Sequence, residues 1–314
     1  MKKGLFSKLI RKRWEIGFVE GGYDAVFSDK KLQVHWVSNP PKDRWYADPF
    51  ILDVTDDKIV VLAEEYRYET EVGRIAKLEI DRKSWALVRA KIILEIDTHL
   101  SFPNIIRYNG EVYVYPENCL SGNLKIYRYD AAQEQLVFEK VICDDALWDS
   151  DITDKFGKWQ LFGGKTNENF LDAYDWDEES AKFVYERSYQ TTKGDFQLAG
   201  KFFEYKGEMY CPNQDCSETY GGAVVIKKVV KKDDGLEFIP VKRLESPSTK
   251  LNQGMHTLNE YKGLLVVDAK GFNNSLVGMM FSAYRRLKRM GKSEYDSSRL
   301  SKGFIVVKSN ESLR

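Results

Sequence analysis

Short apolar strands and polar clusters alternate along the chain in a unit that occurs five times. Each unit has a polar or small cluster, an apolar strand, a Gly or Asp turn, an aromatic-rich strand and a second polar cluster. The units begin near Tyr46, Ser101, Asp149, Leu198 and Met255. They follow one another at intervals of about fifty residues, which is the spacing of propeller blades. The pattern therefore predicts an all-β, five-bladed β-propeller with about four strands in each blade.

The repeat also predicts how the chain is divided. The expected blades span about residues 45–97, 98–145, 146–194, 195–248 and 249–308. A basic N-terminal arm, residues 1–44, is expected to supply strands that close the ring, because the first and last blades must be held together. A short helical insert at 272–301 interrupts the last blade, and 309–314 form a tail. A two-sheet sandwich or two unrelated β domains would not explain five similar units.

Composition narrows the class of protein. The 314 residues are 43% apolar and carry 48 basic and 48 acidic side chains, so the chain should fold without a global field that attracts nucleic acid. No apolar stretch reaches the length of about 18 residues that a membrane span needs. The cations Arg11, Lys12 and Arg13 stand where a signal peptide would be apolar. Together with four cysteines that lack paired spacing, these features favour a cytoplasmic protein with reduced thiols.

Polar residues at the strand ends should gather at one mouth of the propeller channel. Acidic groups dominate there, and carboxylates crowded in a recess must partly hold protons, which is how general acids and bases arise. The expected catalytic residues are Asp48, Glu117 and Asp151. The expected substrate-binding residues are Trp45, Glu65, Ser101, Asn104, Asn118, Asp149, Lys165, Gln214, Asp215 and His256.

Structural roles are open for several of these residues. Asp48 precedes a proline and could be a turn residue, Glu117 could be a solvated strand end, and His256 could be a buried core histidine. Asp149 and Asp151 form a D-x-D triplet, a form that binds divalent metal and nucleotide sugar in many transferases. A divalent cation at these two aspartates is therefore a candidate cofactor, although the sequence does not identify one. Aromatic residues near the same clusters favour a saccharide as the substrate.

Several motifs, taken as a set, resemble a known family. The motifs are Trp45–Phe50, His99–Pro103, Tyr115–Asn118, Asp149–Ile152, Ala199-Gly200, Asn213–Cys216, Tyr220-Gly221 and Met255–Thr257. From about Trp45 to Asp268 the chain is similar to the N-terminal propeller domain of glucosamine inositolphosphorylceramide transferases and its stand-alone bacterial relatives. The resemblance implies a five-bladed propeller that acts in glycan assembly.

That family is in turn similar to the five-bladed glycosidases of the arabinanase, xylosidase and fructosidase types. This more distant resemblance implies that Asp48 is a base or nucleophile and that Asp149 or Asp151 tunes the site. Ala199-Gly200-Lys201 stands where the glycosidase acid would be sought. Glu117 or Asp215 would therefore have to serve as the acid.

Two basic amphipathic segments lie outside the repeat. Residues 1–14 combine Lys and Arg with apolar side chains, and 272–292 place apolar residues and cations such as Arg285 and Arg289 on different helical faces. Such segments suit an anionic membrane surface, while the alternative is an ordinary helix packed on the propeller wall.

The sequence thus favours an enzyme of cell-surface glycan biosynthesis that transfers a glycosyl group at the inner membrane surface. Its expected partners are a saccharide or nucleotide sugar and a lipid-linked acceptor. The alternatives are a glycoside hydrolase with paired carboxylates and a non-catalytic glycan-binding propeller that assists a partner enzyme.

Overall fold

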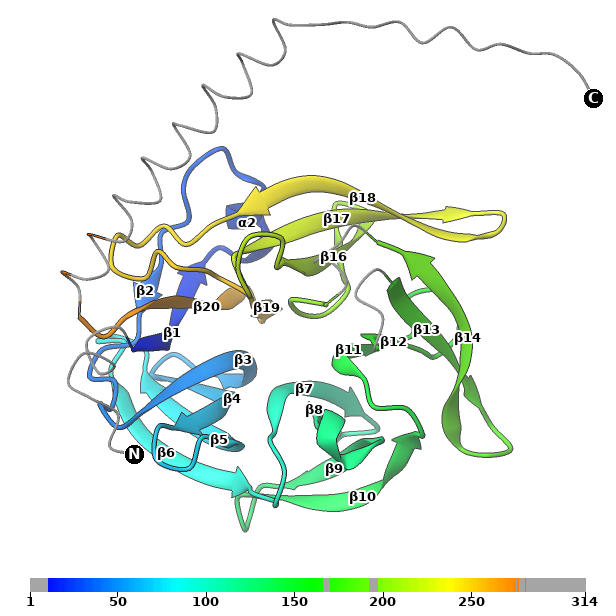
Figure 1. Cartoon of the computed structure of the whole chain (residues 1–314), viewed down its shortest axis with the longest axis horizontal. Helices are drawn as coiled ribbons and strands as arrows, with labels where there is room; N and C mark the ends of the chain where they lie inside the picture. Colours follow the sequence, from blue (N-terminus) through cyan, green and yellow to red (C-terminus); the bar gives the residue numbers. More distant parts are fainter. Residues whose placement is uncertain (1–10, 166–169, 192–196, 275, 277–279, 281–314) are drawn as a thin grey trace, which may run out of the picture. The chain divides into compact units, whose positions relative to one another are not determined.

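The computed structural model describes residues 11–165, 170–191, 197–274, 276 and 280. Within this part of the chain, five four-stranded antiparallel sheets are arranged around a centre (Figure 1). The architecture confirms the predicted five-bladed, all-β propeller. The long strands arise from β-branched and aromatic runs that end at Gly, Asn or Asp turns, as at Asn109-Gly110.

The first four blades follow the order of the sequence. Blade 1 comprises β3 (Arg44–Val54), β4 (Lys58–Arg67), β5 (Gly73–Asp81) and β6 (Leu87–Leu94). Blade 2 comprises β7 (Ser101–Tyr108), β8 (Glu111–Glu117), β9 (Leu124–Asp130) and β10 (Gln135–Cys143), with the short 3₁₀ helix η1 (Cys119–Ser121) between β8 and β9. Blade 3 comprises β11 (Trp148–Thr153), β12 (Gln160–Gly164), β13 (Phe170–Asp177) and β14 (Lys182–Gln190). Blade 4 comprises β15 (Phe203–Tyr205), β16 (Glu208–Asp215), β17 (Ala223–Lys232) and β18 (Gly235–Leu244).

Blade 5 is built from both ends of the propeller chain. Its strand order is β19 (Leu258–Tyr261), β20 (Leu264–Phe272), β1 (Lys12–Glu20) and β2 (His35–Trp36), with helix α2 (Gly22–Phe27) between β1 and β2. Strands from the N-terminal arm therefore occupy the third and fourth positions of this sheet, which removes two free sheet edges. The tail, nearly all of the predicted helical insert, including residues 281–301, and the predicted end of the last blade, residues 302–308, lie outside the described residues.

The hydrophobic core lies between neighbouring blades. Between blades 5 and 1, for example, Phe18 and Val266 pack in one cluster with Ile59, Val61 and Leu78. Blade strands are covered on both faces, so β4 is buried along most of its length. Burial of each such side chain stabilises the fold by about 1.5–3 kcal/mol relative to exposure. This packing fixes the inner strands, and with them the polar strand ends at the mouth.

The first strands of blades 1, 2 and 3 share an unusual backbone feature. Asp48, Phe102 and Asp149 have left-handed φ values of 50°, 44° and 43°, and each lies where the pairing register with the next strand shifts. Non-glycine residues rarely adopt this conformation, and bulges of this kind re-aim side chains. Asp149 is thus the structural counterpart of Asp48. The sequence repeat instead aligns Asp151 with Pro49, which is one residue away from this register.

Candidate functional site

Carboxylates of one blade bind the strained backbone of the next. The N–H of Asp48 donates to Asp268 at 3.0 Å, the N–H of Phe102 donates to Asp48 at 3.3 Å, and the N–H of Asp149 donates to Glu117 at 3.1 Å. These bonds tie blade 5 to 1, 1 to 2 and 2 to 3. Strained backbone that its surroundings hold in place is often found at functional sites. The same carboxylates therefore have a structural role and are brought together at the mouth.

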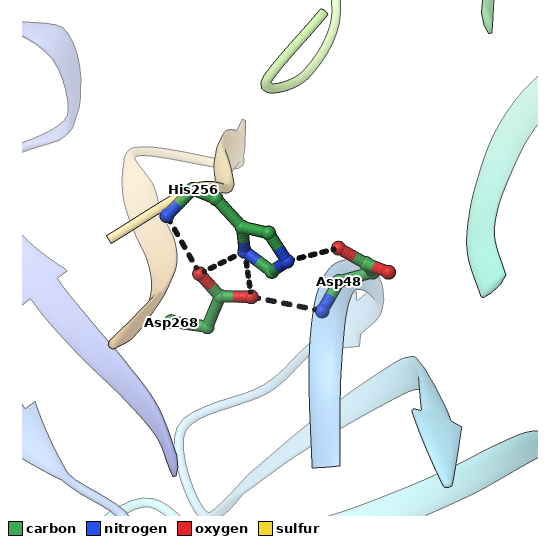
Figure 2. A group of neighbouring side chains, drawn as sticks. All are labelled: Asp48, His256 and Asp268. Carbon is green, nitrogen blue, oxygen red and sulfur yellow. Dashed lines mark hydrogen bonds and ion pairs between the residues drawn. The ribbon is translucent and has the colours of Figure 1, made fainter. Parts of the chain in front are cut away.

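A buried histidine joins two of the aspartates (Figure 2). His256 Nδ1 lies 2.8 Å from the Asp268 carboxylate, and its Nε2 lies 3.4 Å from Asp48 Oδ1. The hydroxyl of Thr257 donates to the same Asp48 oxygen at 3.0 Å. All three members of the charged group are almost wholly buried, with Asp268 at 0% exposure. The Asp48 carboxylate is thus oriented by His256, by Thr257 and by the N–H of Phe102.

The pKa values within this group follow from burial and mutual attraction. Burial opposes a charged imidazole, but the carboxylates of Asp268 and Asp48 outweigh it, so the pKa of His256 is raised. Burial likewise opposes ionisation of Asp268, but its contact with His256 prevails and lowers its pKa. Burial and the nearby Asp268 raise the pKa of Asp48 despite the attraction of His256. These interactions favour a charged imidazole and an ionised Asp268, and they make Asp48 more basic than an exposed aspartate.

Three further carboxyl groups complete an acidic cluster with Asp48. Burial raises the pKa of Glu64, and the charges of Asp48 and Glu117 raise it further. Burial also raises the pKa of Glu117, and the pKa of Asp149 lies well above its usual range because of burial, the charges of Glu117 and Asp48, and a side-chain hydrogen bond to Glu117. The hydrogen bond between Glu117 and Asp149 favours the ionised form of Glu117 and the protonated form of Asp149. We refer to Asp48, Glu64, Glu117 and Asp149 as the acidic cluster.

Two side chains of blade 4 reach the acidic cluster. Gln214 Nε2 donates to Asp149 Oδ2 at 2.7 Å, so this predicted residue lies at the site. Tyr220 is 54% exposed as a whole, but desolvation of its hydroxyl and the charges of Asp149, Asp48 and Glu117 raise its pKa well above the usual range. An exposed ring whose hydroxyl lies near carboxylates suits contact with a polar ligand.

Asp151 has different surroundings from the acidic cluster. Its Oδ1 accepts hydrogen bonds from Asn104 at 3.1 Å and from the Tyr115 hydroxyl at 3.3 Å, and its Oδ2 accepts the N–H of Phe202 at 2.8 Å. Both oxygens of Asp151 are thus engaged in holding blades 2, 3 and 4 together. Asp151 and Asn104 thus contact each other and neighbouring blades, and the catalytic role of Asp151 stays a prediction.

Two predicted residues of blade 1 also contribute to structure. Trp45 stacks on Tyr66, with ring centroids 4.6 Å apart. Glu65 is buried and forms ion pairs with Arg44, Arg67 and Arg74. Neither contact leaves the side chain directed at the acidic cluster.

The other predicted binding residues have mixed positions. Ser101 is buried opposite Glu117 in the β7–β8 pairing, and Asn118 accepts a hydrogen bond from Thr98 while its buried Nδ2 has no partner among the described residues. Lys165 forms a 2.8 Å ion pair with Asp145. Burial opposes ionisation of Asp215, but Ser217 and Arg243 outweigh it and lower its pKa. Asp215 is therefore a poor candidate for the acid.

A metal ion is one alternative occupant of the site. The donor atoms of Asp48, His256 and Asp268 lie within 4.8 Å of one another. However, the imidazole already bridges the two carboxylates, and a charged imidazole supplies the positive charge that they require. We therefore interpret the three as an ion-paired group. A divalent cation at Asp149 and Asp151 stays a prediction.

The predicted membrane residues are only partly described. Arg13 forms an ion pair with Glu15, Arg11 and Lys12 lie at the start of the described chain, and Arg285 and Arg289 fall outside the described residues. In the described part of the chain, no helix combines the length and apolar character needed to cross a bilayer.

Four residues at or near the site, Glu64, Asp268, Thr257 and Trp14, have no role in the sequence-based predictions. The signal for Thr257 was its place beside His256 in the repeat. Trp14 had no local signal, because it reaches the site only through the pairing of β1 with β20 in blade 5.

The fold and the site define a five-bladed propeller with a buried acidic cluster at its channel mouth. The sequence profile of the family described as "Glucosamine inositolphosphorylceramide transferase 1, N-terminal" matches residues 35–262. The chain belongs to this family.

The chain is also similar to curated plant proteins. It is 30% identical over 202 residues to glucosamine inositolphosphorylceramide transferase 1 of Oryza sativa subsp. indica, which covers 59% of the chain and 26% of that protein. It is 29% identical over 252 residues to the protein of the same name from Arabidopsis thaliana, covering 69% of the chain and 32% of the plant protein. The chain thus spans only about a quarter to a third of these relatives.

Solved structures share the fold at low sequence identity. A GH43 β-xylosidase/α-arabinofuranosidase from a compost microbial metagenome has a TM-score of 0.54 at 13% identity, covering 74% of this chain and 92% of that one. A GH43_1 enzyme from Xanthomonas citri has a TM-score of 0.51 at 12% identity, covering 73% and 88%. These likenesses show the five-bladed fold alone.

Proposed function

We propose that the acidic cluster is a saccharide-processing site and that the chain takes part in glycosyl transfer. The observation that carries the proposal is the gathering of four carboxyl groups from blades 1, 2 and 3 with raised pKa values. Perturbed carboxyl groups beside the partly exposed Tyr220 suit acid–base chemistry on a sugar. The plant relatives are named glucosamine inositolphosphorylceramide transferases, and this name supports transfer as the reaction.

The pKa differences assign the roles. The pKa of Asp149 lies well above its usual range, so its carboxyl group would donate a proton to the oxygen of the leaving group as the bond to the anomeric carbon breaks. Asp48 would accept the proton of the attacking hydroxyl, or attack the anomeric carbon itself. His256 and Thr257 would hold Asp48 in place, and Glu117 would hold the proton on Asp149 until transfer.

Hydrolysis is the second candidate, because the same carboxyl pair could activate water in place of an acceptor hydroxyl. The test compares the two reactions with one set of variants. The protein is incubated with uridine and guanosine diphosphate sugars plus saccharide acceptors, and separately with 4-nitrophenyl glycosides. Release of nucleoside diphosphate with a new glycoside favours transfer, and release of nitrophenol favours hydrolysis.

The critical variant is Asp48→Asn, which preserves size while removing the charge. We expect turnover to fall about 10²–10⁴-fold with the fold retained. Asp53→Asn is the matched control, because Asp53 lies on the same strand and pairs with the exposed Lys262 at 2.9 Å. Wild-type turnover in a folded Asp48→Asn variant would return Asp48 to a purely structural role. Saturable binding of saccharide without turnover in either assay would favour the glycan-binding alternative.

We also propose that the protein works in the cytoplasm at the anionic inner membrane surface, where it would meet a lipid-linked acceptor. The basic N-terminal segment supports this, since each cation near such a surface contributes about 1 kcal/mol. Sedimentation with vesicles containing anionic lipid should weaken as salt rises and should fall when Arg11, Lys12 and Arg13 are changed to Gln. Replacing the exposed Lys30 and Lys31 with Gln is the control. Salt-independent sedimentation would overturn this part of the proposal.

A further inference from the structure

The ring-closing strand β1 contributes an aromatic face to the site. Trp14 stacks on His256, with ring centroids 3.8 Å apart and planes inclined by 10°. At this distance and angle the indole and imidazole rings are stacked face to face. Trp14 is 7% exposed, so the contact is shielded from water. A cation held over a desolvated indole face is stabilised by the ring quadrupole.

Other elements enclose the same histidine. Tyr220 approaches the His256 ring edge-on at 5.6 Å, and a Cβ on Gly221 would lie 2.7 Å from His256 Cβ and 3.0 Å from the Trp14 ring. Gly221 has a left-handed φ of 58°, so glycine allows this approach. On β20, Lys270 places its ammonium 4.7 Å from the centre of the Trp14 ring. The imidazole therefore cannot tilt without displacing several packed groups.

We propose that Trp14 is a positioning residue for His256, whose indole face orients the imidazole between Asp268 and Asp48 and favours its charged form. The charged and titratable groups around the imidazole are Asp268 and Lys270 of β20, Asp48 of β3 and Tyr220 of the loop before β17. Strand β1 thus closes the ring of blades and also supplies the indole face that favours the charged imidazole. Only the consequence for turnover rests on the proposed function; the consequence for proton binding does not.

The test follows His256 by NMR. The chain has three histidines, His35, His99 and His256, so imidazole signals can be assigned from single His→Gln variants and titrated with pH. Trp14→Leu keeps an apolar side chain but removes the π face, and we expect the pKa of His256 to fall by about 0.4–1.5. This equals a loss of proton affinity of about 2- to 30-fold. Trp14→Phe should give a smaller fall and serves in its place if the Leu variant does not fold.

A second substitution should change the pKa of His256 in the opposite direction. Lys270 lowers the pKa of His256 by repulsion, so Lys270→Met should raise that pKa, whereas general loosening of the site would move both variants in the same direction. Trp85→Leu is the matched control, because Trp85 stacks on His35 at 4.4 Å, and it should leave the pKa of His256 unchanged. An unchanged or raised pKa of His256 in folded Trp14→Leu or Trp14→Phe would overturn the proposal.

If the wild-type protein shows turnover, the limb of its pH–rate profile that His256 controls should move with the NMR value in the Trp14 variants. A profile that stays fixed while the NMR value moves would overturn the proposed role of His256 in the reaction and leave its stacking on Trp14 intact. The two proposals are thus tested by separate measurements.

Discussion

Two consecutive glutamates on β4 show how one strand serves both structure and function. Glu64 and Glu65 are 5% and 1% exposed, yet their side chains project to opposite faces of the strand. Glu65 accepts hydrogen bonds from Arg44, Arg67 and Arg74. Glu64 faces the acidic cluster instead, and its buried Oε1 has no hydrogen-bond partner within the described part of the chain.

The difference lies in how each charge is compensated. Three guanidinium groups donate hydrogen bonds to the side chain of Glu65. Glu64 lies beside other carboxyl groups, and its Oε1, which is 3.3 Å from His99 Nε2, has no hydrogen-bond partner in the part of the chain that the structure describes. Uncompensated buried charge costs stability and persists at sites where function requires it. The two glutamates therefore differ in their surroundings, because arginines bind Glu65 whereas Glu64 lies among the carboxyl groups of the acidic cluster.

The largest predicted effect is on Glu65. Glu65→Gln removes the charge that three arginines share, and breaking a buried ion pair by removing one partner costs about 3–5 kcal/mol. Denaturant unfolding should show this loss of free energy of unfolding. Glu245→Gln is the control, because Glu245 forms a 3.4 Å pair with Arg243 and both side chains are largely exposed. A loss below about 1 kcal/mol for Glu65→Gln would contradict the structural assignment.

Glu64→Gln should act in the opposite direction. Removing a charge from the acidic cluster relieves repulsion and desolvation, so we expect the free energy of unfolding at neutral pH to rise by roughly 0.5–2 kcal/mol. The adjacent Glu65→Gln variant is the matched control of the same chemistry. Destabilisation by Glu64→Gln would mean that the acidic cluster is compensated by contacts comparable to those of Glu65.

The sequence predicts the fold well and the site incompletely, for a physical reason. Blade spacing, turns and strand patterns are local, so the five-bladed fold and a mouth containing Asp48, Glu117 and Asp149 follow from the repeat. Whether a buried carboxylate is compensated depends on cross-strand and inter-blade partners. Glu65 meets Tyr46 and Arg74 across two strand pairs, and no local pattern distinguishes it from Glu64.

The bulge positions explain another difference. The sequence repeat aligns Asp151 with Pro49, the residue after Asp48. In the structure, the register shift between Trp148 and Asp151 makes Asp149 the residue with the left-handed backbone. A shift of one residue changes which side chain points to the channel. Sequence reasoning could narrow the choice to the D-x-D triplet, while the choice within it depends on the bulge.

Stability should depend on pH through Glu64, the rest of the acidic cluster and His256. A raised folded-state pKa means that the folded protein binds the proton more tightly than the unfolded chain, so stability falls as pH rises from about 4 through the raised values of the acidic cluster. His256, also raised, adds to the fall above about 6.5. Thermal unfolding across pH 4–9 should therefore give a maximum at mildly acidic pH. The slope should flatten in Glu64→Gln, and an unchanged slope would contradict the assigned direction for Glu64.

The smallest predicted effect uses tyrosines to test whether burial gives the Glu65 contacts their strength. The Tyr46 hydroxyl donates to Glu65 at 3.3 Å in a buried setting, whereas the Tyr205 hydroxyl donates to Asp24 at 2.7 Å in an exposed one. Tyr46→Phe should cost about 1 kcal/mol, and Tyr205→Phe should cost less although its hydrogen bond is shorter, because water replaces the lost donor only at the exposed site. Denaturant unfolding of both variants measures the difference. A larger loss for Tyr205→Phe would mean that hydrogen-bond length, and not burial, governs these contacts, and the contrast between Glu64 and Glu65 would then need another cause.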